Sequence, residues 1–198
     1  MNNQPIEQRR PASGQTQQAS ELQLFMRARD GDVSAFEELY RGYHPRLARF
    51  LSRMLRRPQM VEEVLNDTMM VVWQKSRSFE GASKLSTWIF GIAYRKALNA
   101  RSRSDEPVED LDWMERVSVD PTPEEELAQA RRRCLLWGAI GELSADHRTV
   151  LDLTYNHEMG YTEIASIMGC PVGTVKTRMM HARLHLKKRL AGDLAEWI

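Results

Sequence analysis

A run of basic side chains near the C-terminal end of the sequence has the chemistry to bind the phosphates of a nucleic acid. Residues 171–189 contain no aspartate or glutamate. Their lysines and arginines are Lys176, Arg178, Arg183, Lys187, Lys188 and Arg189. Cations clustered along one helix are the electrostatic footprint of nucleic-acid binding. The run therefore predicts an element that contacts phosphate.

The basic run forms the second half of a predicted helix-turn-helix. Apolar residues recur with helical spacing from Ile164 to Met168, a Gly-Cys-Pro break follows, and the spacing resumes at Val172. The pattern indicates two short helices joined by a tight turn. In such a motif the second helix enters the major groove, where its N-terminal residues meet base edges.

The remaining segments predict helices only, because no part of the chain alternates with the two-residue period of a strand. We expect an all-α fold in which an N-terminal helical bundle is joined by a linker to a C-terminal helix-turn-helix domain. The expected segments are a disordered tail over residues 1–20, the bundle over 21–104, the linker over 105–126 and the C-terminal domain over 127–198. The tail is assigned from its Gln, Asn, Pro and Ser content.

Local signals predict where several helices begin and end. Ser34 with Glu37 resembles a capping box, and Ser144 is a suitable N-cap. Pro45 is expected to break or restart the helix in which it lies. A further helix is expected within residues 127–143, with its apolar residues on one face.

The formal net charge of +1 conceals a division of charge along the chain. Residues 1–104 carry 17 basic against 10 acidic side chains, residues 105–126 carry 1 against 10, and residues 127–198 carry 10 against 7. Two basic blocks therefore flank an acidic connector, which by composition is a charged disordered tether.

Neither catalytic chemistry nor a metal site is indicated by the sequence. Cys134 and Cys170 lack the spacing of a zinc site or a disulfide framework, and His157-Glu158 is not followed by the second histidine of a metalloprotease motif. No phosphate loop or nucleophile elbow is present. We expect no cofactor, no metal and no enzymatic activity. Without an apolar run of about 18 residues or a signal core, we expect a cytoplasmic protein that does not insert into membranes.

Four phrases, in order, resemble the extracytoplasmic-function (ECF) sigma factors of bacterial RNA polymerase, in the sigma-70 family. They are GDVSAFEELYRGY, VEEVLNDTMMVVW, FEGASKLSTWIFGIA and CPVGTVKTRMMHAR, and the resemblance covers residues 22–190. It implies a subunit that binds the polymerase core, recognises −35 and −10 promoter elements and promotes DNA melting. The bundle would be sigma region 2 and the C-terminal domain sigma region 4. For the acidic connector the resemblance implies a segment that mimics nucleic acid near the polymerase channel, with Trp113 and Met114 as candidates to anchor it; the alternative is a charged tether.

The resemblance assigns one acidic helix face to the clamp of the largest polymerase subunit. Its residues are Glu62, Glu63, Asn66, Asp67 and Met70. Opposite charge on two partners supplies association rate and register more than raw affinity. The alternative is an ordinary solvated helix face.

The resemblance also implies a −10 DNA surface, because a flipped base and a melted strand need polar groups and cations. The candidates are Lys84, Ser86, Arg95, Lys96, Asn99 and Arg101. Many relatives carry Asn at the position of Arg95, so the resemblance does not predict the −10 base preference of this chain. Trp88 shares the apolar stripe of Ile89 and Ile92 and is expected in the core.

The predicted recognition helix supplies the −35 candidates. Lys176, Thr177, Met180 and His181 are expected to meet base edges, and Thr174, Arg178 and Arg183 to bind phosphate. Val175, Met179 and Leu186 are expected in the core. The late cluster of residues 187–189 is better explained as a solvated helix end, which the helix dipole favours.

One alternative remains open for the whole chain. A stand-alone helix-turn-helix regulator would bind duplex DNA tightly without polymerase, whereas a sigma factor would need the polymerase core. Relatives are commonly inhibited by an anti-sigma factor, so such a partner is possible here.

Overall fold

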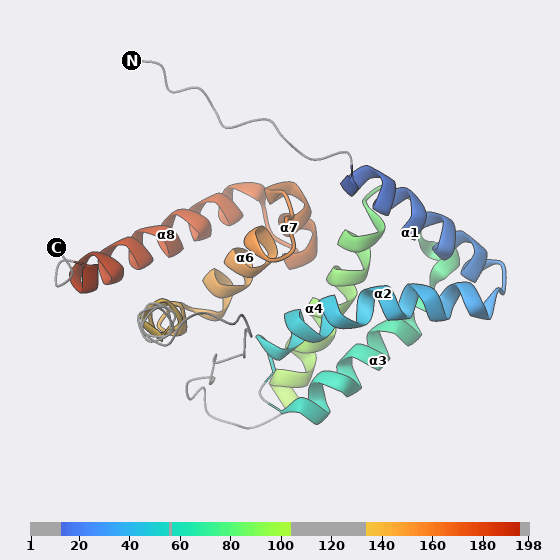
Figure 1. Ribbon diagram of the computed structural model, residues 1–198, viewed down its shortest axis with the longest axis horizontal. Coiled ribbons are helices and arrows are strands. Elements are labelled where there is room, and N and C mark those ends of the chain that lie inside the picture. The colour runs from blue at the N-terminus through green and yellow to red at the C-terminus, as the bar shows by residue number, and fades with distance from the viewer. Residues whose placement is uncertain (1–12, 56, 104–133, 195–198) are drawn as a thin grey trace, which may run out of the picture.

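The structure, a computed structural model, describes residues 13–55, 57–103 and 134–194. All regular secondary structure in these ranges is helical. The elements are α1 (Ser13–Arg29), α2 (Val33–Ser52), α3 (Pro58–Gln74), the 3-10 turn η1 (Ser76–Ser78), α4 (Leu85–Arg103), α6 (Ala145–Tyr155), α7 (Tyr161–Met168) and α8 (Val172–Leu194). A helical segment over residues 134–141 precedes α6. Helices α1 to α4 form one unit and α6 to α8 another (Figure 1). The expected all-α fold is confirmed.

The N-terminal unit is built around large apolar side chains from all four of its helices. Phe25, Leu47, Phe50, Leu65 and Ile89 come from α1, α2, α2, α3 and α4 and are at most 1% exposed. Full burial of a side chain of this size contributes about 1.5 to 3 kcal/mol. The buried stripes fix the rotation of α3 and α4 about their axes, and with it the side chains that these helices present outward.

The N-cap of α2 differs from the sequence prediction. Asp32, not Ser34, is the cap: its Oδ1 accepts the Ala35 N–H at 3.1 Å and the Ser34 hydroxyl at 2.6 Å. These two hydrogen bonds, together with those that the Arg27 guanidinium donates to Oδ2, hold the pKa of the Asp32 carboxyl well below its usual range. The carboxylate is the stronger acceptor for exposed N–H groups at a helix N-terminus.

Helix α2 runs through Pro45 without interruption, so the expected break at this residue is wrong. Pro45 itself is exposed, while Tyr43 and Leu47 on either side of it are buried. Proline removes one hydrogen bond from a helix interior. Here the packing of the flanking apolar residues preserves the helix.

Helix α1 begins at Ser13, within the segment that composition predicted to be a disordered tail. The first turns of α1 contain three Gln residues and one Ala, which have good helix propensity. The apolar residues that follow pack on α2. Residues 1–12 lie outside the described residues, as does the predicted linker with its two anchor candidates, Trp113 and Met114.

The C-terminal unit contains the predicted helix-turn-helix. Ser144 caps α6 as expected, accepting the His147 N–H at 3.4 Å. Helix α7 ends at Gly169, whose φ of 64° is left-handed and therefore favours glycine. Val175 and Met179 of α8 are buried as predicted, and Leu186 is partly buried against the same core.

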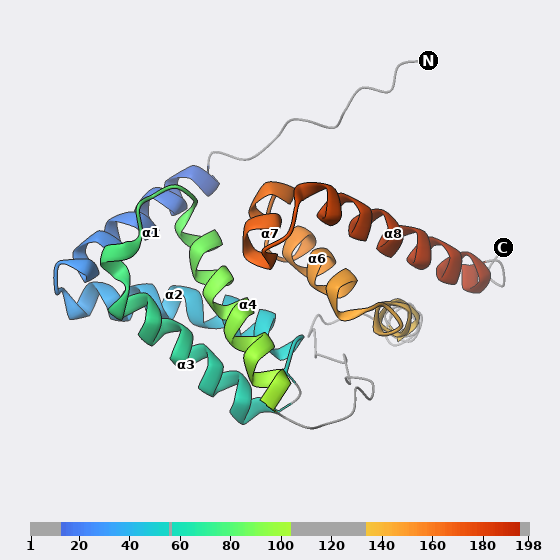
Figure 2. The same cartoon turned by 180° about the vertical axis from the view of Figure 1, so that it is seen from behind.

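The two units pack against each other through α4 and α7, which lie side by side in both views (Figures 1 and 2). In the described part of the chain, no helix is long and apolar enough to cross a membrane.

Candidate nucleic-acid interface

The outward face of α8 carries the four residues that the sequence predicted to meet base edges. Lys176, Thr177, Met180 and His181 are all exposed, and Met180 retains 57% of its accessible surface. Their spacing places them opposite the buried residues of the same helix, which are Val175, Met179 and Ala182. A long basic and polar stripe therefore faces solvent along the first turns of α8.

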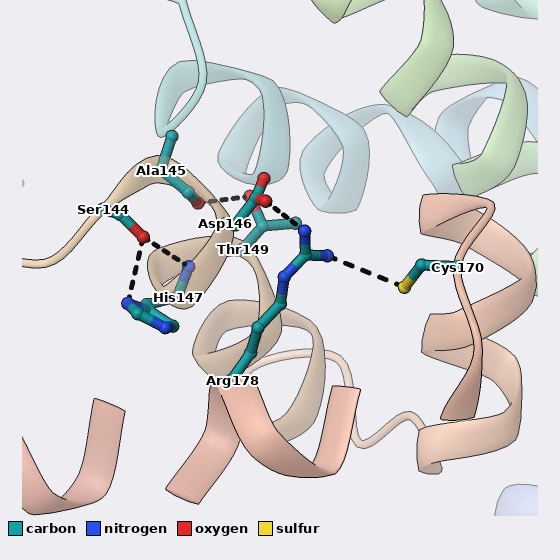
Figure 3. A network of polar contacts seen from close by, with 7 residues as sticks. All are labelled: Ser144, Ala145, Asp146, His147, Thr149, Cys170 and Arg178. Atoms are coloured by element: carbon teal, nitrogen blue, oxygen red, sulfur yellow. Dashed lines mark hydrogen bonds and ion pairs between the residues drawn. The ribbon is translucent and has the colours of Figure 1, made fainter. Parts of the chain in front are cut away.

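Arg178 lies differently from these residues, because its guanidinium points into the C-terminal unit (Figure 3). It forms a short ion pair with Asp146 of α6 and donates to the Cys170 Sγ at 3.6 Å. Arg178 therefore connects α8 to the start of α6 and to the turn after α7. This geometry suits a side chain that orients the recognition helix better than one that binds phosphate.

Arg183 and Thr174, the other two phosphate candidates, flank the same face. Arg183 is exposed and donates to the Tyr155 hydroxyl at 2.9 Å, with its guanidinium 5.9 Å from the centre of the Tyr155 ring. Thr174 is half-buried. In the late cluster Arg189 pairs with Glu142 at 2.8 Å, and Lys187 and Lys188 are exposed.

A pocket of about 410 Å³ lies between α3 and α4. It gathers three of the six −10 candidates, Arg95, Lys96 and Asn99. The other lining residues are Val71, Lys75, Ser78, Trp88 and Ile92. Donor groups beside an aromatic wall can accommodate an unstacked nucleobase, because every base offers a flat face for stacking and acceptors at its edge.

The sequence prediction missed Lys75 and Ser78 as lining residues. They continue the spacing of Val71 along the end of α3 and into η1, but only the packing of α4 turns this stripe into a pocket wall. Trp88, predicted to be core, is half-buried: it packs on Phe25 and Phe79, with ring centres 5.9 and 5.3 Å away, and also lines the pocket.

The three remaining −10 candidates are not among the residues that line the pocket. The Lys84 Nζ lies 2.7 Å from the Glu163 Oε1 of α7, and Ser86 and Arg101 are half-buried at opposite ends of α4. Burial by itself raises the pKa of Glu163, but hydrogen bonds from Lys84 and the Gly160 N–H outweigh it and lower the pKa overall. Glu163 is therefore an ionised carboxylate, and it forms an ion pair with Lys84.

The acidic face predicted on α3 is present and exposed. Glu62, Glu63, Asn66, Asp67 and Met70 all point away from the core, and Met70 is 55% exposed. Glu62 lies 3.4 Å from the His44 Nε2, and Asn66 accepts the Tyr40 hydroxyl at 2.8 Å. Asp67 pairs with Lys96 at 2.8 Å and so joins the acidic face to the pocket.

Both units match family models at the level of sequence. Residues 39–106 match "Sigma-70 region 2", and residues 135–186 match "Sigma-70, region 4". The RNA polymerase sigma-H factor of Pseudomonas aeruginosa is 30% identical over 189 residues, covering 90% of this chain and 98% of that protein. The ECF RNA polymerase sigma factor RpoE of Cereibacter sphaeroides is 30% identical, with 81% and 88% coverage.

Two solved structures share the arrangement of helices. CnrH, in complex with the cytosolic domain of CnrY, is 23% identical, covers 88% of this chain and 99% of its own, and has a TM-score of 0.62, which supports the fold. The sigma factor RpoE of Bartonella quintana, in complex with the anti-sigma factor NepR, is 28% identical, with 79% and 96% coverage and a TM-score of 0.56. The chain belongs to the ECF sigma factors of the sigma-70 family, which are transcription initiation factors of RNA polymerase and not enzymes.

Proposed function

We propose that this sigma factor divides its work between three surfaces: the acidic face of α3, the pocket between α3 and α4, and the outward face of α8. The supporting observation is that a single chain presents two basic, donor-rich surfaces on separate helical units and an acidic surface beside one of them. In this proposal residues 21–104 act as region 2, residues 105–126 as the connector and residues 127–198 as region 4.

The acidic face of α3 binds the clamp of the largest polymerase subunit. Its carboxylates provide complementary charge, and the exposed Met70 supplies apolar contact at the C-terminal end of that face. Because Asp67 also pairs with Lys96, polymerase binding at this face bears directly on the lysine that lines the DNA pocket.

The pocket takes a base from the −10 element once the duplex opens. Trp88 offers a wall, while Lys75, Arg95 and Asn99 offer donors to the base edge or the strand. Lysine and arginine carry no acceptor, so they favour bases rich in acceptor atoms, such as guanine with its O6 and N7. Lys84, Ser86 and Arg101 extend the surface along the melted strand.

The outward face of α8 reads the −35 element in the major groove. Lys176, Thr177, Met180 and His181 meet base edges, and Arg183 with Thr174 binds the flanking phosphates. Arg178 keeps a supporting role through its ion pair with Asp146.

Run-off transcription tests the proposal against a stand-alone regulator. We expect the purified chain with bacterial core polymerase to give a specific transcript from its own promoter, and the chain without polymerase to bind that duplex poorly. A chain that binds duplex promoter tightly by itself and supports no transcript with core polymerase would establish the regulator instead.

We also propose that the chain acts in the cytoplasm and that an anti-sigma factor controls it. The sigma factor RpoE of Bartonella quintana, a solved relative, is in complex with the anti-sigma factor NepR. Co-purification of the tagged chain from cells, followed by identification of a stoichiometric partner other than polymerase, tests this.

A further inference from the structure

The first turn of α6 lies against the recognition helix at the edge of its base-reading face. Asp146 forms a short ion pair with Arg178 of α8, and the two side chains are 46% and 25% exposed. The next residue, His147, packs on His181 of α8, with ring centres 6.1 Å apart and ring planes at 80° to each other. Two consecutive residues of α6 therefore contact α8 at two positions that are neighbours along one side of that helix.

Arg178 connects three elements through one guanidinium group (Figure 3). Its Nη2 donates to the Asp146 carboxylate, and its Nη1 donates at 3.6 Å to the Cys170 Sγ in the turn after α7. A planar guanidinium with two fixed partners has little freedom to rotate. The turn that carries Asp146 is fixed in its own right by Ser144, whose hydroxyl accepts the His147 N–H at 3.4 Å and lies 3.0 Å from the His147 Nδ1. Both sides of the ion pair are therefore well oriented.

The apolar contacts of α8 determine which face of the helix is buried, but they constrain its rotation less. Val175, Met179 and Ala182 are at most 1% exposed, and hydrophobic burial is non-directional. A charge-assisted hydrogen bond, in contrast, depends on both distance and angle. Arg178 makes such a bond within three residues of each of the four base-edge candidates. The ion pair is therefore a directional contact placed beside the base-reading residues.

A small rotation of α8 is enough to lose contacts with base edges. Side chains extend to about 5 to 6 Å from a helix axis, so a rotation of about 20° moves their ends by about 2 Å. Hydrogen bonds need donor–acceptor distances of about 2.7 to 3.2 Å, and functional groups must be held within roughly 0.5 Å of the productive position. Long, flexible cations on the same helix still reach phosphates after such a shift. Rotation therefore removes base discrimination before it removes DNA binding.

We propose that Asp146 and Arg178 are positioning residues for −35 recognition: their ion pair holds α8 at the angle at which its outward residues meet base edges. This inference rests on the proposed function of the α8 face. Asp146 lies on a different helix from the base-reading residues and acts on them through Arg178. Because its charge is neutralised by Asp146, Arg178 does not belong to the cations that bind phosphate.

Asp146→Ala and Arg178→Ala, made singly and together in the full chain, test the proposal. Each removes the ion pair from a different helix, so an effect that both share comes from the pair. Asp146→Glu is the conservative variant, because it keeps a carboxylate within reach of the guanidinium. The matched control is Glu142→Gln. It removes the charge of another carboxylate that pairs with α8, at Arg189 and 2.8 Å, which lies about three turns beyond Arg178.

The first readout is base discrimination by the holoenzyme, reconstituted with core polymerase. Dissociation constants for the chain's own promoter and for promoters with single −35 substitutions give a ratio at each base pair. We expect each alanine variant to lower these ratios by about three- to tenfold at base pairs that the α8 face reads. The double variant should lower them no further than the larger single effect, because both changes remove the same interaction. Asp146→Glu and the control should stay within about twofold of wild type.

The second readout, salt dependence, separates positioning from phosphate contact. Each phosphate contact contributes about 0.9 to the slope of log K against log salt concentration. We expect Arg178→Ala to keep the slope of the wild-type holoenzyme while it loses discrimination. A slope lower by about 0.9 with an equal loss of affinity on every promoter would assign Arg178 to phosphate and overturn the inference.

Two further results overturn the inference. One is unchanged discrimination in Asp146→Ala; the other is an effect of Asp146→Ala at one base pair that persists beside Arg178→Ala, which would make Asp146 a base contact. Circular dichroism verifies helical content, and if Asp146→Ala loses helix, Arg178→Ala decides by the same two readouts. If Lys176→Ala alters discrimination and neither variant of the pair does, the proposed role of α8 stands without the inference. A wild-type holoenzyme without −35 preference would remove both.

Discussion

The exposed residues of α8 differ in what they can contribute to DNA recognition. Lys176 and His181 point outward and form no ion pair with an acidic side chain of the described residues. In contrast, Arg183 donates to the Tyr155 hydroxyl and Arg178 forms an ion pair with Asp146. A side chain that is already oriented by its own protein loses less freedom on binding but has fewer ways to follow a base edge. Lys176 and His181 are therefore the positions at which base preference is best sought.

Replacing Lys176 or His181 by Ala should cost roughly 1 to 3 kcal/mol of discrimination at a single base pair, because each removes a donor to a base edge. Holoenzyme binding to a set of promoters with single −35 substitutions measures this. Arg183→Ala is the comparison, and it should weaken every promoter about equally. A uniform loss for Lys176→Ala or His181→Ala would assign these residues to phosphate.

The buried His157 makes the stability of the folded chain sensitive to acid. Burial is the main cause that lowers its pKa to about 4, and the nearby charges of Arg46, Arg53 and Arg49 add to it. Asp152 lies 3.5 Å from the His157 Nε2 and would favour the charged ring, but it is already paired with Arg53. Unfolded histidine has a pKa of about 6.5, so the unfolded chain binds the proton more readily.

The free energy of unfolding should therefore fall as the pH is lowered from about 6.5 towards 4 and be unaffected by this group above that range. Between pH 7.5 and 5 the loss attributable to His157 is roughly 1 to 2 kcal/mol. Urea titrations at both pH values measure it. His157→Gln should remove this part of the pH dependence, and His44→Gln, at a more exposed histidine, should not. Equal pH dependence in wild type and His157→Gln would exclude the buried ring as its source.

At the scale of elements, α3 presents both of the surfaces that we propose for region 2, one of them together with α4. The acidic residues of α3 face solvent because its apolar stripe, with Val64, Leu65 and Met69, is held in the core. The far side of the same helix, near its end, forms a pocket wall with α4. In the proposed function, the helical period assigns one face of α3 to the polymerase and another to the DNA.

Reversing one charge on α3 should weaken polymerase binding. We expect Glu63→Lys to raise the dissociation constant for core polymerase at least on the order of tenfold, because like charges then meet across the contact. Glu63 is preferable to Asp67, whose pairing with Lys96 would also be lost. Competition for core polymerase against a labelled sigma factor measures the change, with Asp30→Lys on the exposed end of α1 as control. Unchanged competition with intact helical content would show that this face does not bind the clamp.

At the scale of the molecule, the two units share one continuous apolar core in the described residues. Buried side chains run from Phe50 and Phe90 of the N-terminal unit to Met159 and Ile164 of the C-terminal unit without a break. Units joined in this way unfold together, whereas tethered units unfold independently.

Wild-type protein should therefore unfold in one urea transition, with far-ultraviolet dichroism and tryptophan fluorescence coinciding. Two of the five tryptophans, Trp73 and Trp88, lie in the N-terminal unit, so the fluorescence is followed in a background in which Trp113, Trp137 and Trp197 are replaced by Phe. An Asp152→Asn, Glu163→Gln variant removes the charge from two ion pairs between the units, Arg53–Asp152 and Lys84–Glu163. The two signals should separate in this variant, because a weakened interface uncouples the units. Coincident transitions in the variant, or separate ones in wild type, would contradict a shared core.

Local pattern was sufficient to predict most of the helices. Apolar residues spaced by three and four placed α2, α3, α4, α7 and α8, and Ser144 and Gly169 marked helix ends, because these features depend on residues a turn apart. The same periodicity placed Lys176 and Met180 outward and Val175 inward. Pro45 and Ser34 misled the prediction, since tertiary packing and a better cap at Asp32 outweighed their local preferences.

The sequence by itself determined that this chain is a helical protein with a basic recognition helix and an acidic face on α3, because the charge and the apolar spacing of each helix depend only on its own residues. Only the tertiary structure decided which distant residues meet. Arg178 pairs with Asp146, Lys75 and Arg95 line one pocket, and Glu163 forms an ion pair with Lys84. These partners are up to 79 residues apart (Lys84 to Glu163), so their distances follow from how the buried faces of different helices pack, which no local spacing encodes.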